Sequence, residues 1–249
     1  MTNTKKRYEY LDILRGITLI SMIIYHGTWD WVYIVGADWA WFRTDAAFLW
    51  QQSFCWTFIL LAGYCWSFAR HKLKRGCIVF GAGVLITVVT IIFTPRQRVV
   101  FGVLTLLGSC MLLMIPLEKL LRRIKPLPGI VVAAVLFMLT RNINDGYLGI
   151  GEISLLELPD VWYDGGMVMT YLGFMEKGFF STDYFSLIPW LFLFVTGYFI
   201  FRMASEKKVT EGGLLQRIQC KPLAFIGRHS LLIYLLHQPV LYVLLCMGR

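Results

Sequence analysis

The segment YLDILRGITLISMIIYHGTWDWVYIV, residues 10–35, is apolar over most of its length, yet it carries four ionisable side chains inside its apolar pattern. At 100° per residue in an α-helix these side chains fall within about a 60° arc; they are Asp12, Arg15, His26 and Asp30. Charged side chains inside a membrane are costly and normally face a partner, a cavity or a pathway. The segment therefore predicts a first membrane helix with a polar stripe along one face.

The composition of the 249-residue chain is that of a polytopic membrane protein. Hydrophobic residues make up 57% of it and charged residues only 16%, and the mean hydropathy is +0.63, which is too apolar for an ordinary soluble domain. We expect one all-α transmembrane domain over residues 1–249. The six cysteines are scattered without a CxxC motif, so the spacing indicates no metal site.

Six further apolar stretches follow the first, and most approach the ~20 residues that a helix needs to cross the hydrocarbon core. They lie near 46–69, 76–94, 99–117, 127–140, 185–203 and 229–247. The stretch at 127–140 is short, so it either crosses the membrane or forms a re-entrant segment. Two runs rich in β-branched residues, 84–93 and 131–137, are expected to be helical because lipid excludes an open strand. The prediction is a bundle of about seven spans.

Glycines within these stretches would allow neighbouring helices to approach closely. They are Gly81, Gly83, Gly102, Gly108 and Gly197.

Lysine and arginine are distributed unequally between the two sides of this predicted topology. With the N-terminus inside, seventeen of the 24 fall in segments expected to be cytoplasmic and six in outer segments. Such a bias sets orientation, so we expect a multi-pass protein of the cytoplasmic membrane with a cytoplasmic N-terminus. The net charge of +9 then faces anionic lipid and does not call for nucleic acid.

The longest stretch without an apolar run is 141–184, which this topology places outside the cell. It combines acidic and aromatic side chains, and residues 167–180 predict a helix at the membrane interface. Long loops of this kind are often functional, and acidic with aromatic side chains suit a sugar or an amine. A solvated connector is the alternative.

Three motifs point to one family. They are LDILRG at 11–16 with His26 and Asp30, DYFSLIPW at 183–190, and FIGRHSLLIYLLHQP at 225–239. Together they resemble the bacterial proteins of the heparan-α-glucosaminide N-acetyltransferase catalytic-domain family, which belongs to a larger group of transmembrane acyltransferases. The resemblance implies acetyl-CoA as an acyl donor that enters from the cytoplasm. Full-size members have more spans than the seven expected here, which implies a reduced core or a homo-oligomer.

The donor implied by this resemblance needs cations for its phosphates. Arg15 is expected toward the nucleotide end, because arginine makes bidentate contacts to phosphate. Further positive charge at the cytoplasmic mouth would come from Lys72, Lys74, Arg75 and Arg228. The alternative for Arg15 is a structural ion pair with Asp12, three residues back, and the two roles can coexist.

His26 lies about 16 Å, or three turns, along the same helix from Arg15. It would act either as the base that takes a proton from the acceptor or as a carrier of the acetyl group. Asp30, one turn later, would then orient the imidazole. His237 and Gln238 would line the donor tunnel or supply a second acid or base, and packing is the alternative.

Asp183 and Trp190 flank Pro189 at the outer end of the sixth apolar stretch. They are candidates for the acceptor site or a gate; a helix cap and an interfacial aromatic are the plain alternatives.

The function expected from these observations is transfer of an acetyl group from cytoplasmic acetyl-CoA to an amino or hydroxyl group of an extracytoplasmic glycan. A small transporter or proton-coupled carrier that uses the same polar stripe is the competing interpretation, although no pair of broken helices marks a midplane solute site.

Overall fold

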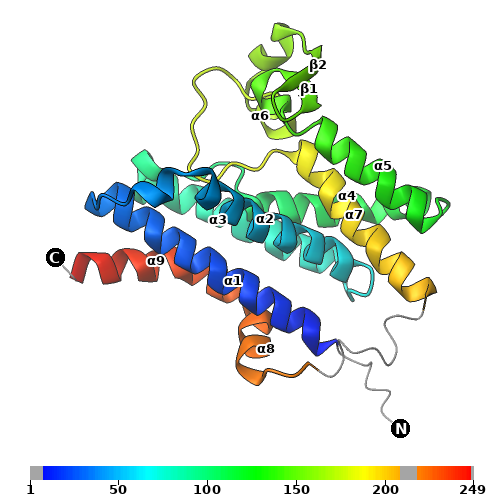
Figure 1. The fold of residues 1–249 in the computed structure, drawn as a ribbon, viewed down its shortest axis with the longest axis horizontal. Coiled ribbons are helices and arrows are strands. Elements are labelled where there is room, and N and C mark those ends of the chain that lie inside the picture. The colour runs from blue at the N-terminus through cyan, green and yellow to red at the C-terminus, as the bar shows by residue number, and fades with distance from the viewer. Residues whose placement is uncertain (1–7, 208–217, 248–249) are drawn as a thin grey trace. The chain divides into compact units, whose positions relative to one another are not determined.

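Each apolar segment predicted as a span forms a helix in the computed structural model, which describes residues 8–207 and 218–247 (Figure 1). The chain divides into two compact units, Met1–Leu61 with Lys208–Arg249, and Ala62–Lys207. Helix α2, Asp45–Trp66, contains the boundary between them. A single domain over residues 1–249 stays a prediction.

The first unit is built on α1, Glu9–Asp30, which continues into a π-helical turn at Trp31–Val35. Two C-terminal helices pack on it, α8 (Lys221–Arg228) and α9 (Ser230–Met247). Helix α8 was not predicted, because it is only eight residues long and has basic residues at both ends. A proline in its first turn suits a helix start, where the missing N–H has no intrahelical partner.

The aromatic side chain of Tyr25 anchors the second half of α1 in this unit. Its ring packs at 4.9 Å from the ring of Phe42, in the 3-10 helix Ala40–Arg43, and at 5.4 Å from that of Trp50 in α2. Trp50 in turn donates from its indole N–H to the hydroxyl of Ser21, at 2.7 Å. These contacts fix the part of α1 around Tyr25, the residue before His26, against α2 and the 3-10 helix.

The second unit contains four longer helices, in which α3 packs on α4, and α7 packs on both α4 and α5. They are α3 (Lys72–Phe93), α4 (Val103–Leu121), α5 (Pro126–Leu139) and α7 (Leu187–Glu206). A Cβ on Gly83 would lie 2.5 Å from the Thr105 hydroxyl oxygen, and one on Gly108 would lie 2.4 Å from the Phe80 nitrogen. The expected close helix contacts are therefore confirmed at these two glycines, whereas Gly81 faces open space.

Helix α4 begins four residues later than predicted. Phe101 adopts a left-handed φ of 57°, and the Val103 N–H is bound by the Asp183 carboxylate at 3.1 Å. Residues 99–102 are therefore a connection rather than a first helical turn, although their apolar character is the same.

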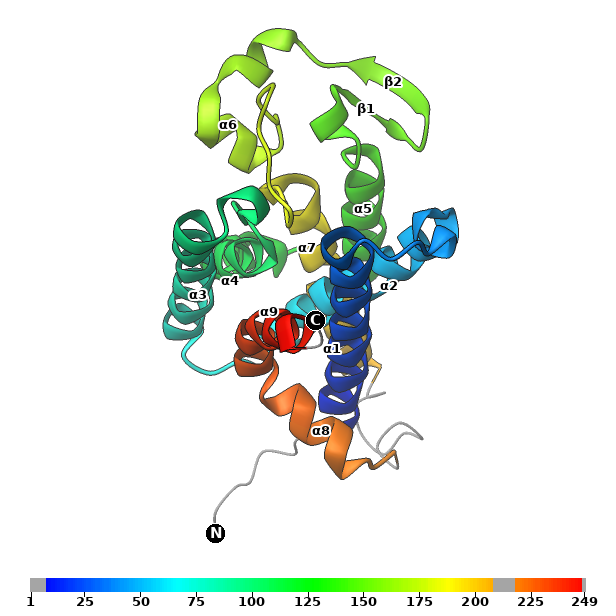
Figure 2. The ribbon, with the colours of Figure 1, turned by 90° about the vertical axis from the view of Figure 1, so that its left-hand side faces the viewer.

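The segment 141–184 contains a hairpin that the sequence analysis missed. Strands β1 (Tyr147–Ile150) and β2 (Ile153–Glu157) pair antiparallel, with Ile150 opposite Ile153. The expected helix at 167–180 is only α6, Gly166–Leu172, because the chain turns at Gly173 with a φ of 137°. Figure 2 shows β1, β2 and α6 together on one side of the four long helices of this unit.

Among the described residues, four helical stretches are long and apolar enough to cross a membrane: Lys72–Phe93, Val103–Leu121, Pro126–Asp145 and Leu187–Glu206. The short fifth stretch reaches this length because a 3-10 turn at Ile143–Asp145 follows α5. The apolar stretch of α9, Ser230–Leu245, is shorter. The protein is thus an all-α membrane helical protein. The number of crossings and the cytoplasmic N-terminus stay predictions.

Candidate active site

The first and third sequence motifs meet where α1 crosses α8. A Cβ on Gly16 would lie 2.3 Å from the Leu223 carbonyl oxygen, and one on Gly227 would lie 1.8 Å from the Asp12 carbonyl oxygen. No side chain larger than hydrogen fits at either place without moving a backbone. The glycines of LDILRG and FIGRHS therefore allow the two helices to touch through their backbones (Figure 2).

This crossing gathers two guanidinium groups around one carboxylate. Asp12 is buried, and its Oδ1 atom lies 3.2 Å from Arg15 Nη1, while its Oδ2 atom lies 3.7 Å from Arg228 Nε. The Arg15 side chain stays 22% exposed and that of Arg228 39% exposed, so both keep donors that can face a ligand. The predicted ion pair of Arg15 with Asp12 is confirmed, and two of the residues proposed for the donor share one cluster.

Farther along α1, the two histidines singled out from the sequence face each other. The ring centroids of His26 and His237 are 5.1 Å apart, with 54° between the planes. His26 is in α1 and His237 in α9, two helices that pack together in the first unit. The sequence indicated each imidazole separately; the fold makes them a pair.

The hydrogen bonding of His237 defines which of its nitrogens is free. The Nδ1 atom lies 2.5 Å from the carbonyl oxygen of Tyr234, one turn earlier in α9. A carbonyl only accepts, so Nδ1 carries the proton and the neutral ring has a lone pair on Nε2. That Nε2 atom is buried, and no partner for it occurs among the residues that the structure describes. In its neutral form the ring therefore presents a buried nitrogen lone pair beside His26.

Asp30 and Gln238 form a second contact between α1 and α9. The Gln238 Nε2 atom donates to both carboxylate oxygens of Asp30 at 3.0 Å, and Asp30 is fully buried. The described hydrogen bonds of Asp30 go to Gln238 rather than to His26. A direct orienting role for Asp30 on His26 stays a prediction, while its contact to the residue that follows His237 holds α9 on α1.

The amide oxygen of Gln238, Oε1, is buried and has no hydrogen-bond partner within residues 8–207 and 218–247. A buried acceptor of this kind is costly unless a donor reaches it. Gln238 Oε1 and His237 Nε2 belong to adjacent residues, so two unsatisfied acceptors occur at one place on α9.

Three of the predicted donor-binding cations belong to the second unit, at the start of α3. The Lys72 ammonium lies 3.0 Å from the Glu118 carboxylate and 3.6 Å from the centroid of the Trp66 ring. This side chain thus fastens the start of α3 to the end of α4. Lys74 and Arg75 are exposed. A role for these three residues in donor binding stays a prediction.

Asp183 and Trp190 also lie in the second unit, where both have structural contacts. Asp183 accepts from the first N–H of α4, as given above, and so acts as a cap. Trp190 is buried, with ring centroids 5.0 Å from Phe185 and 5.5 Å from Phe137, and the Arg141 guanidinium lies 5.1 Å from it. These contacts favour the plain alternatives of cap and packing aromatic; an acceptor-binding role stays a prediction.

Two features of this site were not predicted from the sequence. Gly16 and Gly227 were quoted in motifs but not matched to each other, and the Tyr234 carbonyl was not considered as the partner of His237. The i to i+3 spacing of Tyr234 and His237 in a helix could have indicated their contact. No local pattern could have indicated the contact between the helices of Gly16 and Gly227, because it joins distant parts of the chain.

Comparison with known proteins agrees with the motifs. The family model described as heparan-alpha-glucosaminide N-acetyltransferase, catalytic, matches residues 7–239. No curated protein and no solved structure matches the chain. The matched range contains every residue of the α1, α8 and α9 contacts described above, and from nearly full coverage it follows that the chain belongs to the heparan-α-glucosaminide N-acetyltransferase catalytic-domain family.

Proposed function

We propose that this protein is an integral membrane acyltransferase that moves an acetyl group from cytoplasmic acetyl-CoA to an amino or hydroxyl group of an extracytoplasmic glycan. Family membership supports the acetyltransferase class. The observation that carries the proposal furthest is the pair of imidazoles from α1 and α9, one of which has a buried nitrogen without a partner among the described residues.

The two ends of the proposed donor match two clusters along α1, one shared with α8 and the other with α9. Arg15 and Arg228 offer guanidinium groups of the kind that bind phosphate in a bidentate way. The imidazole pair lies eleven residues farther along, about 16 Å in a helix. Gln238 Oε1 supplies a buried acceptor for an amide N–H in the arm that joins the two ends of the donor.

The chemistry assigned to the imidazoles is proton transfer. His237 Nε2 takes the proton of the acceptor amine or hydroxyl as that group forms a bond to the thioester carbonyl carbon. The carbon–sulfur bond then breaks, and the imidazolium returns the proton to the departing thiolate. Passage of the acetyl group through an imidazole nitrogen of His26 or His237 is the two-step alternative; both routes use the same pair.

The test is acetyl transfer by purified protein in proteoliposomes, with radiolabelled acetyl-CoA on one side and glucosamine as the acceptor probe. The informative variants are His26→Gln and His237→Asn, each compared with wild type at equal amounts of folded protein. We expect both to lose transfer while CoA still raises the thermal midpoint. Unchanged transfer in both variants, or the absence of any CoA effect on wild type, would overturn the proposal.

A proton-coupled carrier is the second candidate, favoured by the row of buried polar groups shared by α1 and α9: Asp30, Gln238 and His237. It predicts proton flux through proteoliposomes under a pH gradient in the absence of any acyl donor. The acyltransferase predicts no such flux, so a pH-sensitive dye inside the vesicles separates the two.

A further inference from the structure

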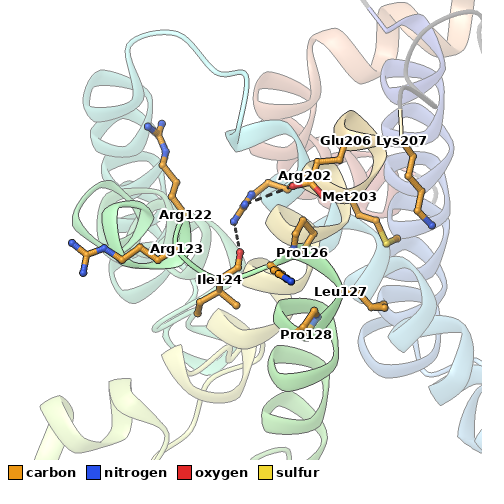
Figure 3. Close-up of a pocket in the computed structure, with 11 residues that line it drawn as sticks. Arg122, Arg123, Ile124, Pro126, Leu127, Pro128, Arg202, Met203, Glu206 and Lys207 are labelled. Carbon is orange, nitrogen blue, oxygen red and sulfur yellow. Dashed lines mark hydrogen bonds and ion pairs between the residues drawn. The ribbon is translucent and has the colours of Figure 1, made fainter.

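A cavity of about 540 Å³ lies in the second unit, where α4 ends, α5 begins and α7 ends (Figure 3). This volume is within the range of small-molecule sites. Five basic side chains and one acidic side chain belong to its lining: Arg122, Arg123, Lys125, Arg202, Lys207 and Glu206. None of these residues was assigned to the proposed reaction, and the strong excess of positive charge indicates an anionic occupant.

Arg202 is the fixed cation of this cavity. Its Nη1 atom donates to the carbonyl oxygens of Leu121 and Ile124, each at 2.9 Å, so the end of α7 is tied to the α4–α5 connection. Arg122 is engaged as well, by the Glu118 carboxylate at 2.8 Å. The remaining cations are exposed, and Figure 3 shows Arg123 and Lys207 extending from opposite sides of the cavity.

The same cavity has an apolar component that a free phosphate would not need. Leu127 is 62% exposed and Ile124 is 39% exposed, and Pro128 is exposed beside them. All three helices that meet here belong to stretches apolar enough to cross a membrane. Their ends are where hydrocarbon gives way to the polar headgroup region, so exposed aliphatic side chains next to cations face both parts of a lipid molecule.

We propose that this cavity binds the phosphate headgroup of an anionic phospholipid, with the acyl chains against Ile124 and Leu127. The predicted orientation agrees, because it places the α4–α5 connection and the end of α7 on the cytoplasmic side, where anionic lipid is recognised by basic pockets between helices. The N-terminus of α5 adds the positive end of a helix dipole at the same place. The phosphates of a soluble nucleotide such as CoA share this chemistry, and the experiment separates the two sources.

The experiment measures lipid retention by native mass spectrometry and the thermal midpoint of the purified protein in detergent. Short-chain phosphatidylglycerol is compared with short-chain phosphatidylcholine, inorganic phosphate and CoA at equal ionic strength. For wild type we expect selective retention of phosphatidylglycerol and a midpoint rise that phosphatidylcholine and phosphate do not reproduce. An equal rise with phosphate or CoA, competing with the lipid, would overturn the assignment to lipid, and no selectivity for phosphatidylglycerol would overturn the site.

The variant that tests the location replaces Arg123, Lys125 and Lys207 together with glutamine, and leaves Arg202 to hold the helix ends. Each cation near a lipid surface contributes about a fivefold change in binding, so the triple variant is expected to bind phosphatidylglycerol on the order of a hundredfold more weakly. The single variant Lys125→Gln, expected to lose about fivefold, serves if the triple variant does not fold. Lys119→Gln, an exposed cation on α4 outside the cavity lining, is the matched control; an equal loss there would contradict the proposal.

Discussion

The two units of this protein differ in how completely their polar side chains are paired. In the second unit they fasten helices: Asp183 caps α4, Lys72 binds Glu118, and Arg202 binds two backbone carbonyls. In the first unit, two acceptors on adjacent residues of α9 are left without a described partner, Gln238 Oε1 and His237 Nε2. The second unit has a single such atom among its described residues, the hydroxyl oxygen of Ser67, directly after the end of α2.

When a binding site and a structural scaffold both carry charged residues, the pairing of their buried polar atoms distinguishes them. A satisfied polar group contributes a modest net stabilisation, whereas a buried group without a partner is expensive. Two such groups on adjacent residues are therefore the place where we expect a ligand or a reaction to supply the partner. The first unit therefore carries the candidate site, whereas three predicted site residues of the second unit have scaffold contacts: Lys72, Asp183 and Trp190.

The largest expected effect is that of His237→Asn. The asparagine amide reproduces the Nδ1–H bond to the Tyr234 carbonyl but provides no nitrogen at the position of Nε2. If Nε2 is the base, acetyl transfer should fall by about 10²–10⁴-fold, with little change in the thermal midpoint. Transfer of labelled acetyl to glucosamine is the measurement.

The control for this variant is His229→Asn. His229 makes the same kind of contact, from Nδ1 to the Phe225 carbonyl at 2.9 Å, but on an exposed side chain. Full activity in both variants would remove the distinction between the units, because a free Nε2 would then have no function.

Arg15→Gln is expected to come next. Loss of a charge-assisted contact to phosphate, about 1.5–3 kcal/mol, should raise the KM for acetyl-CoA by roughly 10–150-fold while kcat changes less. Arg43→Gln, on an exposed residue of the same unit, is the matched control. A lower thermal midpoint with an unchanged KM would show instead that Arg15 serves only its ion pair with Asp12.

Gly227→Ala tests the helix crossing that assembles the first unit. The new methyl group would meet the Asp12 carbonyl, and overpacking of this kind costs about 1–3 kcal/mol of unfolding free energy. Gly81→Ala in α3 is the matched control, since its Cβ meets nothing within 4 Å and alanine is favoured over glycine in a helix by about 0.5–1 kcal/mol. Denaturation in mixed micelles compares the two; equal effects would argue against a tight crossing.

The smallest effect is expected at Asp183. Asp183→Ala should lower the unfolding free energy by about 1 kcal/mol because the first N–H of α4 loses its acceptor. Asp183→Asn keeps an oxygen acceptor and should recover most of that stability. The KM for glucosamine in the asparagine variant separates the two roles: a large rise would assign the Asp183 carboxylate to acceptor binding.

The positions of the long helices could be predicted from the sequence because apolar length and helical period are local properties. Residues 46–69, for example, correspond to α2 at Asp45–Trp66. The local sequence pattern gave wrong helix boundaries where contacts with a distant segment determine the backbone conformation. The start of α4 depends on the carboxylate of Asp183, eighty residues away in the sequence. Helix α8 is too short to be predicted from the length of an apolar run.

The sequence by itself determined that this is a helical membrane protein, that Asp12, Arg15, His26 and Asp30 lie along one helix, and which family its motifs resemble. Only the tertiary structure decided that His26 faces His237. The same holds for the hydrogen bond from Gln238 to Asp30, which joins residues 208 positions apart. It holds also for the close backbone contacts of Gly16 and Gly227 where α1 crosses α8. The physical reason is that a helix fixes the spacing of its own side chains, whereas the partner of each side chain depends on which other helix packs against that face. The polar stripe is thus a property of the chain, and the candidate site is a property of the fold.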